Sequence, residues 1–185
     1  MTKNLTLALA AALVGTVVLA NLLVAYVDPI HVGFGQLAPA GVLAAGLAFT
    51  LRDLLQEAGG KRWVIAVIAI GAVISYIVGL LTGKTFPHGP SIARIAFAGA
   101  VAFAISELLD LAVYTPLRSR NWIGAVTASG IVGLFVDSWV FLSIAFGSLS
   151  FFWGQVIGKA EVLTATVIVL LFVRGRLSRT HLAPA

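Results

Sequence analysis

The chain has 185 residues, of which 60% are hydrophobic and only 10% are charged. A soluble domain of this size carries about 25% charged residues, so the surface must be apolar as well as the core, which excludes an ordinary soluble domain. The formal net charge of +5 would suggest a nucleic-acid partner in a soluble protein. In so apolar a chain it indicates basic loops on one side of a membrane instead, and no nucleic-acid partner is expected.

Six apolar stretches are long enough, or nearly long enough, to cross a bilayer, which takes about 20 residues of helix. They cover residues 5–27, 37–55, 63–81, 92–117, 122–145 and 155–173. Turn residues such as Asp28-Pro29 and Gly59-Gly60 separate them. The first stretch is too long for the apolar part of a signal peptide, and no A-x-A site follows it, so we expect it to stay in the mature protein. The pattern predicts one transmembrane domain over residues 1–185, an all-α integral membrane bundle of six helices.

The positions of lysine and arginine predict the orientation of these helices. With the N-terminus inside, nine basic residues fall on the cytoplasmic side and three, Lys84, Arg94 and Lys159, on the outer side. This bias predicts a multi-pass protein of the cell membrane with both termini in the cytoplasm.

Motifs for catalysis and for cofactors are missing from the sequence. There is no cysteine, and the three histidines, His31, His88 and His181, have no metal-ligand spacing. No Walker A pattern, nucleotide-binding glycine motif or catalytic-triad spacing occurs either. We therefore expect no metal, no cofactor and no enzyme activity. The loops are too short for a soluble domain, so any ATP would have to bind to another chain.

Polar residues inside the predicted spans fall into two groups by depth, and each intramembrane charge costs about 2.5–3.5 kcal/mol to insert. The inner group contains Arg52 and Asp53 at the end of the second span. On the fourth span, Glu107, Asp110 and Tyr114 recur at i, i+3 and i+7, on one helix face. The group has two readings: a structural network of ion pairs between helix ends, or an inner gate or proton-coupling site.

The outer group brings Asn21, Asp137, Gln155 and Lys159 to a similar depth from the first, fifth and sixth spans. Asp137 and Lys159 have the charges to pair. An ion pair without a ligand is one reading; the other is a ligand site, because amide, carboxylate and ammonium groups together suit a small heterocycle better than a bare ion. Nearby aromatic residues that could supply a stacking face are Trp139, Phe141, Phe146, Phe151, Phe152 and Trp153. Glu161 lies about 200° around the helix from Lys159, and we predict no role for it.

Four stretches that contain these polar residues resemble the VUT family of vitamin-uptake proteins, whose best-described members transport queuosine precursors. They are residues 49–60 (FTLRDLLQEAGG), 106–120 (SELLDLAVYTPLRSR), 129–147 (SGIVGLFVDSWVFLSIAFG) and 154–163 (GQVIGKAEVL). Asn21, within ANLLVAY, also fits. The chain departs from many relatives in its short length, in Arg52 before Asp53, and in Arg94.

The resemblance implies a six-helix importer of a deazapurine base, 7-cyano-7-deazaguanine or 7-aminomethyl-7-deazaguanine. The family-like polar residues are Asp53, Glu107, Asp110, Asp137 and Lys159. A carboxylate can accept the adjacent N–H and NH₂ of a guanine-like edge as a bidentate pair, and Asp137 is our first choice for this role and Glu107 the second. The ring carbonyl would accept from Asn21, Gln155 or Lys159.

Three other functions remain open at the sequence level. The chain could carry another small heterocycle. It could also be the substrate-binding subunit of an ATP-driven vitamin importer, with Ala8 and Ala12 as its docking face. The third is a membrane enzyme or a purely structural protein, which the absence of catalytic motifs and the number of buried charges argue against. An energising partner and a homo-oligomer are both possible partners, and the sequence does not decide between them.

Overall fold

Six α-helices form the computed structural model, which describes residues 3–82, 90–118 and 122–180. A small antiparallel hairpin separates the first helix from the second. The elements in chain order are α1 (Lys3–Tyr26), β1 (Ile30–His31), the short 3-10 helix η1 (Gly33–Gly35), β2 (Leu37–Ala38), α2 (Val42–Gly59), α3 (Lys61–Thr82), α4 (Ile92–Arg118), α5 (Trp122–Ala145) and α6 (Phe152–Thr180). The predicted all-α class and the six helices are confirmed.

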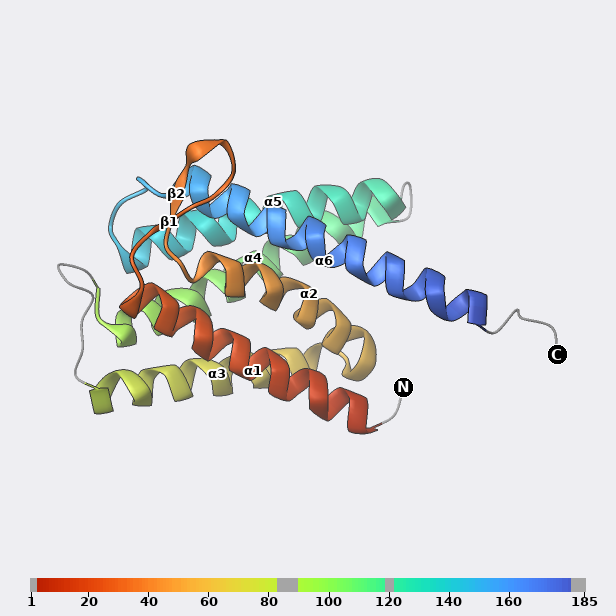
Figure 1. The fold of residues 1–185 in the computed structure, drawn as a ribbon, viewed down its shortest axis with the longest axis horizontal. Helices are drawn as coiled ribbons and strands as arrows, with labels where there is room; N and C mark the ends of the chain where they lie inside the picture. The colour runs from red at the N-terminus through yellow and green to blue at the C-terminus, as the bar shows by residue number, and fades with distance from the viewer. Residues whose placement is uncertain (1–2, 83–89, 119–121, 181–185) are drawn as a thin grey trace.

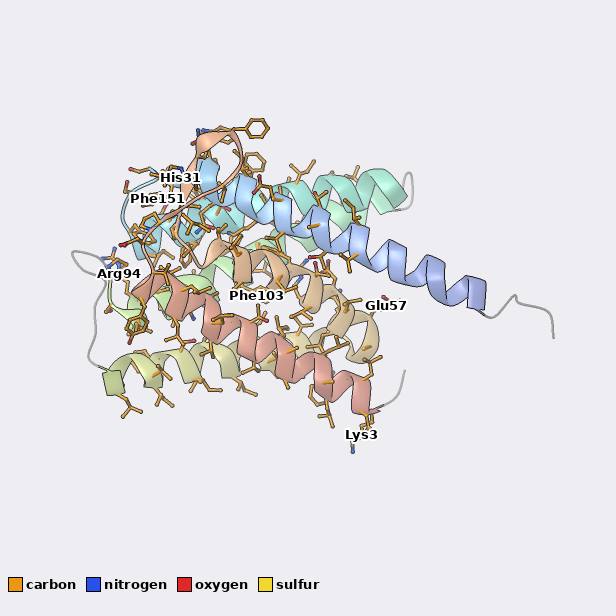
Figure 2. The ribbon with its side chains drawn as sticks, viewed as in Figure 1. Lys3, His31, Glu57, Arg94, Phe103 and Phe151 are labelled. Atoms are coloured by element: carbon orange, nitrogen blue, oxygen red, sulfur yellow. The ribbon has the colours of Figure 1, made fainter. Side chains whose placement is uncertain are left out.

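The helices run along the long axis of the molecule as a bundle (Figure 1). α1 packs against α2 and α3, α4 packs along α5, and α6 packs against α2. His31, Arg94 and Phe151 lie at one end of the bundle, and Lys3 and Glu57 lie toward the other (Figure 2). α1 begins and α6 ends at the same end of the bundle (Figure 1).

Two clusters of buried apolar side chains hold the bundle together. One joins the end of α1 to α4 and α5 through residues such as Val24, Ile95 and Leu142. The other joins α1, α2 and α3 through Leu13 and Leu55, among others. Since α1 contributes to both clusters, it connects the α2–α3 side of the bundle to the α4–α5 side.

By length and apolar composition, α1 passes as a membrane-crossing helix. Among the residues that the structure describes, the shorter apolar helical stretches are Arg62–Val78, Ile92–Ser106 and Gly130–Ala145. Six helices are therefore established, whereas their crossing of a bilayer rests on the hydropathy of the sequence.

The predicted helix over residues 37–55 begins later than expected. Residues 37 and 38 form β2, in which Ile30 pairs with Ala38 and His31 with Leu37, and α2 starts at Val42. Hydropathy alone could not separate these apolar residues from the helix. Pro39 follows the strand, and its missing N–H removes a donor that a helix interior would use. The last helix differs as well, because it runs from Phe152 to Thr180 rather than over 155–173.

Candidate functional site

A cavity of about 110 Å³, called the central cavity below, lies between the two apolar clusters, and residues from all six helices line it. Most of the wall is apolar, with leucine, valine, alanine and phenylalanine side chains. The polar residues on the wall are Asn21, Arg52, Asp137, Gln155 and Lys159. An apolar wall with a few convergent polar groups is the usual composition of a small-molecule site.

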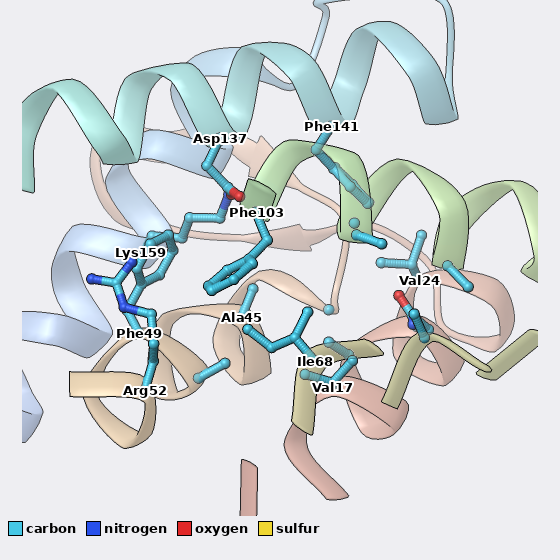
Figure 3. Close-up of a pocket in the computed structure, with 18 of the residues that line it drawn as sticks. Val17, Val24, Ala45, Phe49, Arg52, Ile68, Phe103, Asp137, Phe141 and Lys159 are labelled. Atoms are coloured by element: carbon cyan, nitrogen blue, oxygen red, sulfur yellow. The ribbon is translucent and has the colours of Figure 1, made fainter. Parts of the chain in front are cut away.

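Lys159 and Asp137 form an ion pair on the cavity wall (Figure 3). The Lys159 ammonium lies 2.6 Å from Asp137 Oδ2, and the two side chains are 2% and 14% exposed. The ammonium also donates to Ser138 Oγ at 3.1 Å, and the Ser138 hydroxyl in turn donates to the Leu134 carbonyl. The predicted pair is confirmed. Burying two charges costs several kcal/mol per ion before their attraction is counted. The Asp137–Lys159 pair is therefore weak evidence for stability and a strong marker of a polar site.

Two amides lie on the wall of the same cavity, and they differ in how their hydrogen bonds are satisfied. Asn21 Nδ2 donates to Ser75 Oγ at 2.9 Å in a buried contact between α1 and α3. Gln155 is one helical turn before Lys159 on α6 and is 2% exposed. Its Oε1 is buried and has no hydrogen-bond partner among the described residues. The structure therefore brings Asn21, Asp137, Gln155 and Lys159 to one cavity, as their common depth predicted.

Arg52 corrects the separation into an inner and an outer group. Its side chain lies on the wall of the same cavity as Lys159 and Asp137 (Figure 3). The guanidinium pairs with Asp53 at 2.8 Å and lies 5.1 Å from the centre of the Phe49 ring. Depth along the helix axis placed Arg52 away from the outer group, but a long side chain reaches well beyond its own Cα.

Asp53 lies at the edge of this arrangement, with a side chain that is 60% exposed. It lines a second, smaller cavity of about 60 Å³ that also contacts Arg52, Phe49 and Lys159. Arg52 and Lys159 thus contact both cavities. Glu107, Asp110 and Tyr114 belong to α4, but their side chains lie outside the part of the structure that is described, so their predicted roles stay predictions.

The aromatic residues on the wall differ from those expected. Of the six candidates, Phe141 lines the cavity. Phe146 and Phe151 pack edge to face near the turn between α5 and α6, and Phe152 packs against Trp153 in the same way. Phe49 and Phe103 are the other rings on the wall. For Phe49 the sequence holds a signal in its spacing: it precedes Arg52 by one helical turn, which places the two side chains together.

Glu161, for which the sequence predicted no role, connects α6 to the hairpin. Its Oε1 accepts the backbone N–H of Gly33 at 3.0 Å. Two residues earlier on α6, Lys159 faces the cavity. The same helix therefore carries the ion pair on one side and fixes the hairpin with the other.

Replacing Glu161 with alanine is expected to lower the free energy of unfolding by about 1 kcal/mol, because one hydrogen bond from the Gly33 N–H to a carboxylate is lost at an exposed site. Thermal unfolding of the purified protein in detergent measures the change. Glu57→Ala, an exposed glutamate on α2, is the matched control. Equal melting of the two variants would show that the Gly33 contact contributes nothing to stability.

A helical bundle that encloses an apolar cavity with a buried ion pair is typical of a small-molecule carrier. A family model described as "Putative vitamin uptake transporter" matches residues 39–174 of the chain. The chain belongs to this family, and the resemblance inferred from its polar stretches is confirmed. The matched region contains Arg52, Asp137, Gln155 and Lys159, whereas Asn21 precedes it.

Curated relatives carry names of the same kind. A "Probable queuosine precursor transporter" of Haemophilus influenzae is 31% identical over 119 residues, which are 57% of this chain and 51% of the relative. A "Queuosine precursor transporter" of Escherichia coli is 35% identical over 95 residues, 46% of this chain and 43% of the relative. The chain thus spans about half the length of the curated relatives it matches. No solved structure matches it. The names of both relatives describe transport proteins and not enzymes.

Proposed function

We propose that the chain is a multi-pass transporter that imports a queuosine precursor, 7-cyano-7-deazaguanine or 7-aminomethyl-7-deazaguanine, across the cell membrane. The observation that carries the proposal is the buried Asp137–Lys159 pair on the wall of the central cavity. It stands in a chain of the vitamin uptake family whose relatives are named for queuosine precursors.

The chemistry of the pair suits a guanine-like ring. Asp137 uses one oxygen for Lys159, and a carboxylate has about four acceptor positions in all, so it can also accept the adjacent ring N–H and amino group of the base. Lys159 has three donors, of which two go to Asp137 and Ser138. Its third can go to the ring carbonyl. Charge-assisted bonds of this kind are about twice as strong as neutral ones.

Arg52 and Asp53 are suited to a gate beneath this site. Arg52 lies on the cavity wall, while its partner Asp53 is mostly exposed. Because Asp53 is already exposed to solvent, breaking its ion pair with Arg52 would leave no buried carboxylate without a partner. The free-energy cost of freeing Arg52 to move would therefore be small. We assign Asp110 and Tyr114 of α4 to the same gate or coupling group, and Glu107 to the substrate site, from their positions in the sequence.

Uptake in cells tests the proposal. A host that cannot synthesise 7-deazaguanines is given labelled 7-cyano-7-deazaguanine or 7-aminomethyl-7-deazaguanine, with and without the gene for this chain. We expect gene-dependent accumulation of one or both compounds and of queuosine in tRNA. Equal accumulation without the gene would contradict the proposed function.

The membrane topology gives a further prediction. α1 begins and α6 ends at the same end of the bundle (Figure 1), and the excess of lysine and arginine predicts that this end is cytoplasmic. A reporter fused after Ala185 should therefore read as cytoplasmic. A reporter inserted after Gly35, at the hairpin between α1 and α2, is the control and should read as external. An external signal after Ala185 together with a cytoplasmic signal after Gly35 would contradict the predicted orientation.

The second candidate function is the substrate-binding subunit of an ATP-driven vitamin importer. Ala8 and Ala12 are both exposed on α1, and such small residues would let a helix of the energising partner pack closely against it. Bulky substitutions there would then abolish uptake in cells and leave ligand binding intact. Uptake by the purified chain alone in liposomes would reject this second candidate.

A further inference from the structure

Gln155 has the features of a ligand contact that is incomplete without its ligand. Its side chain is 2% exposed, it lies on the wall of the central cavity, and its Oε1 has no hydrogen-bond partner among the described residues. A buried polar atom without a partner is costly and uncommon in folded proteins. A ligand in the cavity would supply the missing partner.

The backbone holds this amide in place. Gln155 lies in the first turn of α6, where its N–H donates to the Phe151 carbonyl at 2.8 Å. The preceding residue, Gly154, lies against the backbone of Leu37 in β2. Lys159 follows one turn later on the same face of α6, and it also lies on the cavity wall. The amide and the ion pair are therefore arranged to contact one ligand.

A primary amide reads a specific pattern, because it presents one acceptor beside donors in either orientation of its end group. Its complement is a ring edge with a donor beside an acceptor. A deazaguanine has three such edges: the ring N1–H beside the carbonyl, the amino group beside the ring nitrogen N3, and the pyrrole N9–H beside N3. The proposed function already gives the N1–H and the amino group to Asp137. The remaining edge, N9–H beside N3, is free only when no sugar is attached.

We propose that Gln155 reads this remaining edge: its Oε1 accepts N9–H and its Nε2 donates to N3, so that the site takes the free base and rejects a base substituted at N9, such as a nucleoside. The proposal rests on the proposed function, because it uses the contact of Asp137 to orient the ring. It makes Gln155 a specificity-determining residue and not a structural one.

The test compares two ligands on the full-length protein in detergent, 7-cyano-7-deazaguanine and its N9-methyl derivative, by calorimetry. The methyl group removes the N9–H donor while adding little volume. Wild type should bind the free base about 10- to 100-fold more tightly. Gln155→Met keeps the length of the side chain and removes both polar atoms. It should weaken binding of the free base and reduce the ratio between the two ligands to about threefold or less.

A second variant keeps the test decisive where the first does not fold. Gln155→Glu keeps the acceptor for N9–H but loses the donor to N3, so it should bind the free base about tenfold more weakly while still preferring it to the N9-methyl compound. Thr50→Val is the matched control. Thr50 Oγ1 is also buried without a partner among the described residues, but Thr50 is not on the wall of the central cavity, so both affinities should stay unchanged.

The outcomes separate the two proposals. A wild-type protein that binds neither compound would reject the proposed function and the role of Gln155 with it. A wild-type protein that binds the free base, together with a Gln155→Met variant that keeps the full ratio, would reject only the role of Gln155. In that case the shape of the cavity, and not the amide, would exclude the N9-substituted base.

Discussion

Asp137→Asn is expected to lower the affinity for 7-cyano-7-deazaguanine by about 100-fold or more. The substitution keeps the shape of the side chain but replaces one acceptor oxygen with a donor, so that a ring N–H or amino group would face another N–H. Leaving such groups buried without partners costs about 1–3 kcal/mol each, and tenfold in affinity is about 1.4 kcal/mol. Calorimetry on the purified protein measures the loss.

The same substitution affects folding, because it removes the counter-ion of Lys159, a side chain that is 2% exposed. Breaking a buried pair by removing one partner costs about 3–5 kcal/mol. A double variant, Asp137→Asn with Lys159→Gln, removes both charges and should recover much of the lost stability while remaining unable to bind the base. Thermal unfolding without ligand and calorimetry with ligand measure the two effects separately.

Asp28→Asn is the matched control for this experiment. Asp28 is an exposed carboxylate just after α1 and is not on the wall of the cavity, so both stability and affinity should stay close to those of wild type. If Asp137→Asn folds and keeps wild-type affinity, Asp137 does not contact the substrate, and the buried pair is a structural one.

Much of the fold could be predicted because hydropathy and turn residues report on the backbone directly. The breaks at Asp28-Pro29 and at Gly59-Gly60 coincide with the ends of α1 and α2. The hairpin at Ile30–His31 and Leu37–Ala38 could not be predicted in this way. Two-residue strands are too short to show a period of two, and Leu37 and Ala38 of β2 read as the start of the next helix.

The site was predictable along the helix axis and not around it. The rise of 1.5 Å per residue was enough to place Asp137 and Lys159 at one depth, and their charges were enough to pair them. Which face each helix turns inward depends on tertiary packing. For this reason Phe49 and Phe103 were missed as wall residues, and most of the aromatic candidates near the α5–α6 turn contact one another instead.

Arg52 and Glu161 illustrate two further limits of the sequence. Arg52 contacts the cavity because its long side chain extends beyond the depth of its Cα, whereas the sorting by depth used only the backbone rise. The partner of Glu161 is the backbone N–H of Gly33, which is 128 residues away in sequence. A main-chain donor has no signature in the residue type, so sequence patterns could not identify this contact.

The close packing of α6 against the hairpin leads to a second large expected effect on folding. Gly154 is buried in the first turn of α6, and a Cβ added there would overlap the carbonyl oxygen of Leu37. Leu37 cannot give way as a flexible side chain would, because the contact is with backbone and Leu37 pairs with His31 in the hairpin. Gly154→Ala is therefore expected to lower the free energy of unfolding by about 3 kcal/mol or more, at the upper end of the range for overpacked sites.

Gly15→Ala is the control that isolates this steric effect from the loss of a glycine. Gly15 lies in α1, and an added Cβ there meets nothing within 4 Å, so the melting temperature should stay the same or rise, since alanine favours a helix by about 1 kcal/mol over glycine. Equal melting of Gly154→Ala and wild type in detergent would contradict the close contact of α6 with β2. Because Gln155 and Lys159 follow directly on the same helix, a Gly154→Ala protein that still folds should also bind the base more weakly: the hairpin that fixes the start of α6 fixes the cavity wall with it.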